Sequence, residues 1–239
     1  MKYRLRELIF RVFRHPILAT IHVCGGDASK IPISRISSFV QTDSPVIIEA
    51  GAFDGQDTKR FLATWPNCKI FAFEPVPNLA EGLLKLFDGE ERVSVIEKSV
   101  VGGISREVTM YTFQSDSAPN GSSSILQPTG HLDRQPTIDL AKTIKVTGVT
   151  LDDWAESHGV GAVDILWLDL QGAELDVLRS STSLLRRTRI VHVEISDEPL
   201  YLGAAVKQEV IDFLHTKGFR LMLIRQLGIS GNALFVKSL

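Results

Sequence analysis

The sequence has few cysteines, little net charge and no long hydrophobic run. Among its 239 residues are 2 cysteines, Cys24 and Cys68, whose spacing fits neither a metal site nor a disulfide framework, which favours a reducing, cytoplasmic setting. The formal net charge of −2 argues against nucleic acid as the main partner, because phosphate binding needs a basic face. We find no internal repeat. A hydrophobic content of 44% and this length allow a single globular domain with a large core.

The N-terminal segment is basic and apolar, yet it contains no convincing membrane span or signal peptide. Its apolar run at residues 17–24 is too short to cross a bilayer, and His22 interrupts it. We expect a helical, basic segment at residues 1–42, followed by one domain at residues 43–239. Two interpretations stay open for the segment: a helix packed on the domain, or a basic amphipathic helix on anionic lipid that places the protein at the membrane periphery.

Beyond Pro45, apolar runs of strand length alternate with segments of helical periodicity. This alternation predicts an α/β fold with a doubly wound, mostly parallel sheet that ends in an antiparallel hairpin. The expected strands are residues 46–50, 69–74, 93–99, 106–113, 143–149, 163–170, 189–195, 219–225 and 233–237. The expected helices are residues 57–65, 78–87, 151–158, 173–185 and 204–216.

The first two strands carry the clearest functional signal. The first leads from Glu49 into the turn Gly51-Ala52-Phe53-Asp54-Gly55, and the second ends at Glu74-Pro75. In doubly wound sheets, a glycine turn lets the backbone approach a ligand, and an acid at the end of the next strand can bind both ribose hydroxyls. The pattern predicts a site for an adenosine-type cofactor.

The turn lacks the G-x-G-x-x-G spacing of dinucleotide sites, and Asp54 would direct a negative charge at a pyrophosphate. S-adenosylmethionine suits the turn better, because it has no phosphate and carries a sulfonium, an ammonium and a ribose diol. An NAD-dependent oxidoreductase explains Glu74 equally well and remains an alternative. The residues predicted to bind the cofactor are Glu49, Gly51, Phe53, Asp54, Gly55, Glu74, Pro75, Glu97 and Ser99.

Further acids follow the later strands. Asp169 ends a buried strand beside Gly172, where it could orient or deprotonate an acceptor hydroxyl or cap the following helix. Glu194 ends the next strand with His192 on the same face, as a structural pair or a second catalytic group. Asp169, Glu194 and Asp197 could also chelate Mg²⁺, but their spacing alone does not decide this.

The polar stretch at residues 114–142 is too long for a plain connection inside a compact domain. We interpret it as a lid or substrate loop with a short ordered piece near residues 124–126. Ser122, Ser123 and Ser124 are simple loop residues or close over the cofactor, and His131 is a candidate mobile base.

The sequence resembles the FkbM-type methyltransferases, a family with the class I fold that depends on S-adenosylmethionine. The resemblance covers residues 46–237, and the segments that carry it are 48–55, 73–77, 149–154 and 166–178. It implies a Rossmann-like, seven-stranded class I methyltransferase sheet and methylation of hydroxyl oxygens on sugars or natural products. Two departures are Glu49, where an Asp is common, and Gln171, where an acid is common.

Together these observations predict an S-adenosylmethionine-dependent O-methyltransferase, with Asp169 and Glu194 as catalytic residues. The expected acceptor is a small molecule, a saccharide or a glycolipid. A non-catalytic Rossmann-like binding module is a further alternative. The sequence leaves the exact acceptor and the oligomeric state undetermined.

Overall fold

The computed structural model describes residues 29–97, 99–103, 106–114, 121–129 and 139–238. The basic segment at residues 1–24 and His131 lie outside the described residues. In the described part of the chain, no helix combines the length and the apolar character that crossing a membrane requires.

The centre of the molecule is a seven-stranded sheet in the order β3-β2-β1-β7-β8-β10-β9. Neighbouring strands from β3 to β8 run parallel, and β10 pairs antiparallel with both β8 and β9. This is the predicted sheet with its terminal hairpin. Its strands are β1 (Val46–Ala50), β2 (Lys69–Glu74), β3 (Val93–Glu97), β7 (Val163–Leu168), β8 (Thr188–Ser196), β9 (Phe219–Leu227) and β10 (Ser230–Lys237).

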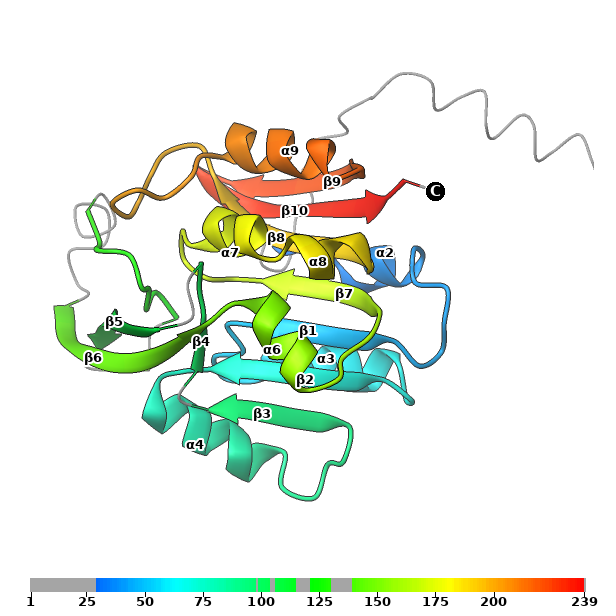
Figure 1. Cartoon of the computed structure of the whole chain (residues 1–239), viewed down its shortest axis with the longest axis horizontal. Helices are drawn as coiled ribbons and strands as arrows, with labels where there is room; N and C mark the ends of the chain where they lie inside the picture. The colour runs from blue at the N-terminus through cyan, green and yellow to red at the C-terminus, as the bar shows by residue number, and fades with distance from the viewer. Residues whose placement is uncertain (1–28, 98, 104–105, 115–120, 130–138, 239) are drawn as a thin grey trace, which may run out of the picture.

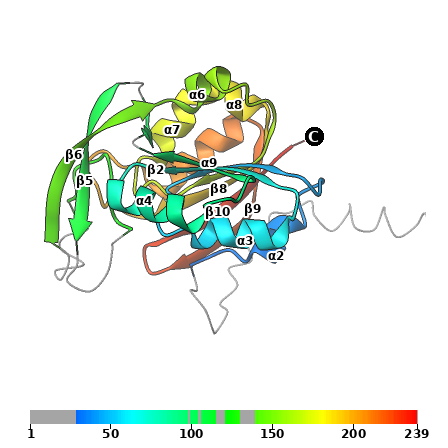
Figure 2. The same cartoon turned by 90° about the horizontal axis from the view of Figure 1, so that it is seen from below.

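Helices cover both faces of this sheet (Figures 1 and 2). One layer packs on the large core cluster that includes Trp154, Leu178 and Leu214, and the other on the cluster that includes Ile36, Phe61 and Leu83. The first layer consists of α6 (Leu151–Ser157), α7 (Glu174–Ser180), α8 (Thr182–Arg186) and α9 (Lys207–Thr216). The second consists of α2 (Ile33–Ser37), α3 (Gln56–Thr64) and α4 (Pro77–Leu86).

The single helix predicted at residues 173–185 is wrong, because α7 and α8 are separate helices. The Ser181 hydroxyl donates a hydrogen bond to the Val177 carbonyl at 2.6 Å, as serine does where it competes with the helical backbone. The Asp152 carboxylate then accepts hydrogen bonds from the amides of Ser183 and Leu184 at the start of α8. A side chain from α6 therefore caps a second helix and fixes the break.

A second sheet of three strands, in the order β4-β6-β5, projects from the edge where the parallel strands end (Figure 1). Its strands are β4 (Ser99–Val101), β5 (Glu107–Gln114) and β6 (Asp139–Val149). The sequence predicted most of these strands but not their separate sheet. The predicted strand at residues 93–99 ends at Glu97, and Ser99 already belongs to the second sheet.

The parallel register brings the predicted functional residues to one edge of the main sheet. Ala50 pairs with Phe73 on one side and with Leu168 on the other, and Leu168 pairs with Val193. The residues that follow or end these strands therefore lie side by side, at the edge where open α/β sheets bind ligands.

Candidate active site

The main pocket opens at this edge and has a volume of about 690 Å³, including space open to solvent. Five of the residues predicted to bind the cofactor or to act in catalysis belong to its lining: Gly51, Phe53, Glu74, Pro75 and Asp169. Its apolar wall includes Val101 of β4, Met110 of β5 and Ile125, which the sequence did not predict. The second sheet and residues 121–125 thus complete a pocket that the glycine turn begins.

Gly51 allows two strands to meet at the floor of the pocket. Its backbone has a φ of 92°, and a Cβ atom there would lie 2.0 Å from the carbonyl oxygen of Asp169. The amides of Gly51 and Ala52 both donate to the Phe73 carbonyl, and the Asp169 amide donates to the Ala50 carbonyl. Only glycine fits between these chains.

Glu74 is buried at the end of β2 and binds the glycine turn. Its Oε2 accepts a hydrogen bond from the Phe53 amide and its Oε1 from the Val76 amide, both at 2.9 Å. Burial raises the pKa of the Glu74 carboxyl to about 7, against the lowering effect of these two amides. A carboxylate has four acceptor positions, so these amides leave capacity for a ligand diol.

Three other residues predicted to bind the cofactor make contacts within the protein instead of lining the pocket. Glu49 is buried behind the turn and accepts a hydrogen bond from the Thr58 hydroxyl at 2.5 Å. Asp54 is exposed and bonds to the amide and the side chain of Gln56 at the start of α3. A Cβ on Gly55 would lie 2.9 Å from Leu83, so this glycine serves packing against α4. None of the three lines the main pocket.

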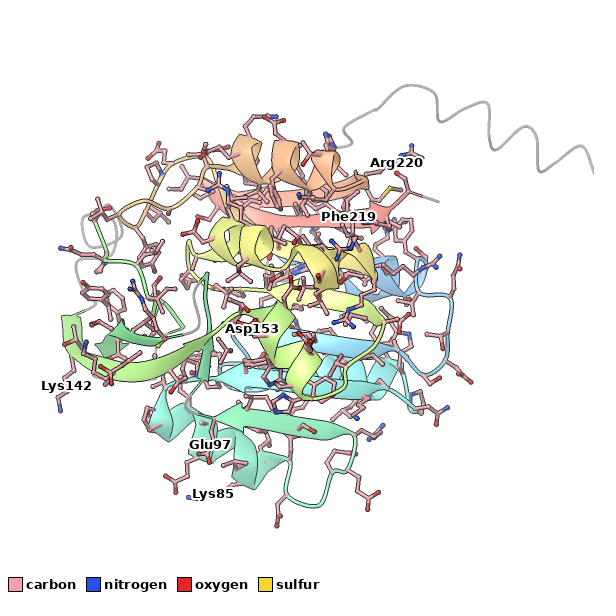
Figure 3. All side chains as sticks on the ribbon, in the orientation of Figure 1. Lys85, Glu97, Lys142, Asp153, Phe219 and Arg220 are labelled. Atoms are coloured by element: carbon pink, nitrogen blue, oxygen red, sulfur yellow. The ribbon has the colours of Figure 1, made fainter. Side chains whose placement is uncertain are left out.

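The remaining two lie farther along the same edge. Glu97 is exposed at the end of β3, at the lower edge of the molecule in Figure 3, and is not among the residues that line the pocket. The backbone of Ser99 belongs to β4, and its side chain lies outside the described residues. Cofactor binding by Glu97 and Ser99 stays a prediction.

Asp169 and Glu194 meet beside the pocket, joined by a residue that the sequence did not assign to the site. Nε2 of Gln171 donates hydrogen bonds to Asp169 Oδ1 and to Glu194 Oε2, each at 2.8 Å. The Gln171 carboxamide oxygen accepts from the Tyr201 hydroxyl at 3.2 Å. In the sequence, Gln171 stood out only because the FkbM-type methyltransferases commonly have an acid at this position. No sequence feature pointed to Tyr201.

The two carboxyl groups also interact with each other. Burial raises the pKa of Asp169, and the donor from Gln171 opposes that rise. Burial and the charges of Asp169 and Glu174 hold the pKa of Glu194 well above its usual range. Glu194 is therefore the member of the pair that keeps a proton.

A second, smaller pocket lies on the Glu194 side of this pair. Gln171, Gly172, Glu194 and Tyr201 belong to its lining, together with residues of the loop before α9. Gln171 thus stands between the two pockets, since Asp169 lines the first and Glu194 the second.

The hydrogen bond expected between His192 and Glu194 is not formed. The His192 ring stacks on Trp167, with centroids 3.5 Å apart, and neither ring nitrogen has a hydrogen-bond partner among the described residues. Burial lowers the pKa of His192 to about 3, so the ring is neutral. Asp197, the third acid considered for Mg²⁺, is exposed and pairs with Lys207 at 2.5 Å.

Of the lid predicted at residues 114–142, both ends belong to strands, because residue 114 ends β5 and residues 139–142 begin β6. Residues 121–129 are the rest of its described part. Gly121, Ser123, Ser124 and Ile125 line the main pocket. Ser124 pairs with Tyr111 of β5, and its hydroxyl donates to the Gln171 carbonyl at 2.8 Å. The ordered piece expected near residues 124–126 is therefore present, and Ser124 and Ile125 of it line the pocket.

Comparison with known proteins decides the family. Residues 49–221 match the profile described as the methyltransferase FkbM domain. The chain belongs to the FkbM methyltransferase family. It is also 30% identical over 203 residues to 2-O-methyltransferase NoeI of Sinorhizobium fredii, covering 84% of this chain and 82% of that protein.

Solved structures of related shape are more distant. Fibrillarin of Methanococcus jannaschii is 11% identical, with a TM-score of 0.48 over 82% of this chain and 67% of that one. Precorrin-6y C5,15-methyltransferase of Geobacter metallireducens is 12% identical, with a TM-score of 0.47 over 86% and 87% of the two chains. These likenesses carry no weight for the activity, and the fold rests on the strand order itself.

Membership of the FkbM family confirms a methyltransferase that uses S-adenosylmethionine, and it sets aside the oxidoreductase and binding-module alternatives. The pocket fits this cofactor. Gly51 belongs to its lining, the Glu74 carboxylate can accept hydroxyls, and Val101, Met110 and Ile125 offer an apolar wall for a base.

Proposed function

We propose that this FkbM methyltransferase transfers the methyl group to a hydroxyl oxygen of a saccharide or a glycolipid. The activity in the name of the NoeI relative supports an oxygen acceptor. The observation that carries the proposal is the position of Asp169, which lines the cofactor pocket and is joined through Gln171 to Glu194 in the neighbouring pocket. The main pocket would hold the cofactor and the neighbouring one the acceptor.

In this proposal, Glu74 binds the ribose diol and the turn at Gly51 and Phe53 lies against the methionine part. Bound S-adenosylmethionine supplies an electrophilic methyl group, and the acceptor oxygen bonds to it as the carbon–sulfur bond breaks and leaves its electron pair on sulfur. Asp169 orients the hydroxyl and takes its proton, while Glu194 stays protonated beside it. Residues 121–125 limit the access of water to the reacting groups.

The proposal includes no divalent cation. Asp197, the third acid considered for Mg²⁺, pairs with Lys207 instead. Both N–H groups of the Gln171 carboxamide are directed at the two carboxyls that would bind the ion. Within the described residues, no group of three or more His, Cys, Asp or Glu side chains is arranged to hold a metal.

Peripheral membrane binding by residues 1–42 stays part of the proposal for a glycolipid acceptor. Liposome sedimentation of the full chain and of a chain lacking residues 1–25 tests it. Equal binding of the two forms to anionic vesicles would contradict a lipid role for this segment.

The decisive experiment has two steps. Calorimetric titration with S-adenosylhomocysteine first establishes the cofactor site, with Glu74→Ala as the variant expected to lose binding. Incubation with methyl-labelled cofactor and a panel of hydroxyl-bearing saccharides then seeks label in an O-methyl ether by mass spectrometry. Absence of binding in the folded wild-type protein, or labelled product on nitrogen or carbon only, would contradict the proposal.

A further inference from the structure

Gln171 places one nitrogen between two acids at the wall that separates the pockets. The distances from Nε2 to Asp169 Oδ1 and to Glu194 Oε2 are both 2.8 Å. A carboxamide nitrogen carries two hydrogens, so each carboxyl receives one of them. The arrangement fixes the separation and the orientation of both carboxyl groups with a neutral side chain.

Gln171 is itself held in an unusual conformation. Its φ is 52°, in the left-handed region that residues other than glycine rarely adopt. Its carbonyl accepts from Ser124 at 2.8 Å, and its carboxamide oxygen accepts from Tyr201, whose hydroxyl also bonds to the Ser122 carbonyl at 2.9 Å. Backbone strain of this kind persists where the surroundings over-determine it, often at functional sites.

We propose that Gln171 is a positioning residue, whose carboxamide holds Asp169 ionised and facing the acceptor hydroxyl while it fixes the protonated Glu194 beside it. The inference rests on the proposed function and deepens it, because it names the side chain that holds Asp169 in the base role. Tyr201 and Ser124 then support Gln171, because they hold it in place from the loop before α9 and from the lid.

The charges around the pair decide the direction of a pH effect. Lys30 and the hydrogen bond with protonated Glu194 favour the ionised form of Asp169, whereas the nearby carboxyl of Asp57 opposes it. Glu174 and Glu49 are buried acids with a raised pKa, and the neutral His192 lies two residues before Glu194 on β8. The pKa of Tyr201 is raised, so its hydroxyl stays protonated. The hydrogen bond from Gln171 lowers the pKa of Asp169 more than any of these charged groups does.

The test replaces Gln171 by Met, which keeps the length of the side chain without its donors. We expect the pKa of Asp169 to rise by about one pH unit, the scale of one hydrogen bond to a carboxylate. Carboxyl-carbon NMR of protein with ¹³C-labelled aspartate measures this without an acceptor, with the Asp169 signal assigned by its loss in Asp169→Asn. Gln171→Glu, which replaces the donor by a further acid, should raise the pKa more than Gln171→Met.

Kinetics provide the second readout. The acidic limb of the kcat/KM profile should move to higher pH by the same amount as the Asp169 titration, with activity recovering above the new midpoint. A merely structural role for Gln171 would lower activity at every pH. Gln226→Met is the matched control. Gln226 also donates a hydrogen bond to a carboxylate, that of Asp197, but neither residue lines either pocket. This variant should leave both midpoints unchanged.

An unchanged Asp169 titration in both Gln171 variants would overturn the inference, as would a loss of activity that is independent of pH. Failure of the proposed function is a separate result, because it appears in the wild-type protein as no binding of S-adenosylhomocysteine. Gln171 does not line the cofactor pocket, so its variants should keep wild-type affinity for that ligand, which verifies that they are folded.

Discussion

Gly51 and Asp169 approach so closely that residue 51 has no room for a side chain. The Asp169 carbonyl oxygen lies 2.0 Å from the position of a Cβ on residue 51. The pair ties the glycine turn after β1 to the candidate base after β7, so a side chain at residue 51 would displace the backbone of Asp169.

Gly51→Ala should therefore abolish cofactor binding and lower the free energy of unfolding by about 1–3 kcal/mol, through overpacking and the positive φ. Gly89→Ala is the matched control, because Gly89 has a similar φ of 76° but open space around its Cβ position. Urea unfolding and calorimetric titration with S-adenosylhomocysteine measure both effects. Equal losses in the two variants would show that the backbone conformation, and not the contact with Asp169, sets the cost.

Glu74→Gln should weaken S-adenosylhomocysteine binding by about 1.5–3 kcal/mol, roughly 10- to 150-fold, the scale of hydrogen bonds to a charged group. Glutamine has a single acceptor oxygen, so it cannot serve the Phe53 and Val76 amides together with a diol. Glu81→Gln, at an exposed position on α4, is the control and should bind normally. Wild-type affinity in Glu74→Gln would contradict a ribose contact, and Glu97→Gln in the same series tests the prediction for Glu97.

The affinity of the wild-type protein for this ligand should depend on pH. Burial raises the pKa of free Glu74 to about 7, and a diol that donates hydrogen bonds prefers the ionised carboxylate. Binding therefore weakens as the pH falls below 7, by up to about tenfold per unit for one displaced proton. Titrations at pH 6, 7 and 8 measure this. A flat profile in the wild-type protein would contradict the assignment.

Glu49→Gln should stabilise the protein at alkaline pH. Burial raises the pKa of Glu49 to about 8 in the folded protein, from an ordinary value of 4.5. The folded state thus holds a proton that the unfolded state releases, so the stability from Glu49 is full below pH 4.5 and is lost as the pH rises through 8. Glutamine keeps an acceptor for Thr58 without this loss.

The measurement is urea unfolding at pH 5, 7 and 9, where the variant should match the wild type at pH 5 and exceed it at pH 9. Glu74 and Glu174 titrate near 7, and Glu194 also has a raised pKa. All three are present in both proteins, so the difference between the variant and the wild type belongs to Glu49. Glu90→Gln is the control: Arg92 lowers the pKa of Glu90 to about 2, so this change should not alter the pH dependence in that range. A variant that loses stability at pH 9 would show that Glu49 is needed as a carboxylate.

Removal of divalent cations should leave methyl transfer unchanged. Gln171 occupies the two carboxyls that would hold the ion, and Lys207 pairs with the third. Dialysis against a chelator followed by an assay with and without added Mg²⁺ tests this. An activity that is lost on dialysis and restored by Mg²⁺ would contradict the role given to the carboxamide.

Several features could be predicted from the sequence because neighbouring residues encode them. Apolar runs of strand length located the parallel strands, and Thr150 marked the start of α6 with its hydroxyl bonded to the Asp153 amide. Gly51 and Glu74 were found because a turn of positive φ needs glycine and a strand that ends in an acid is a local pattern. These signals do not depend on how distant segments meet.

The tertiary structure alone decided which of the acids share a site. Hydrogen bonds join Gln171 to Glu194, 23 positions away, and Ser124 to Gln171, 47 positions away. Such contacts follow from sheet register and from the second sheet, so no pattern within a few residues reveals them. The sequence by itself determined the order of elements, the glycine turn and the acids at the strand ends. Only long-range packing buried Glu49, exposed Asp54 and set Gln171 between two carboxyls, because burial and side-chain partners depend on chain segments that the local sequence does not contain.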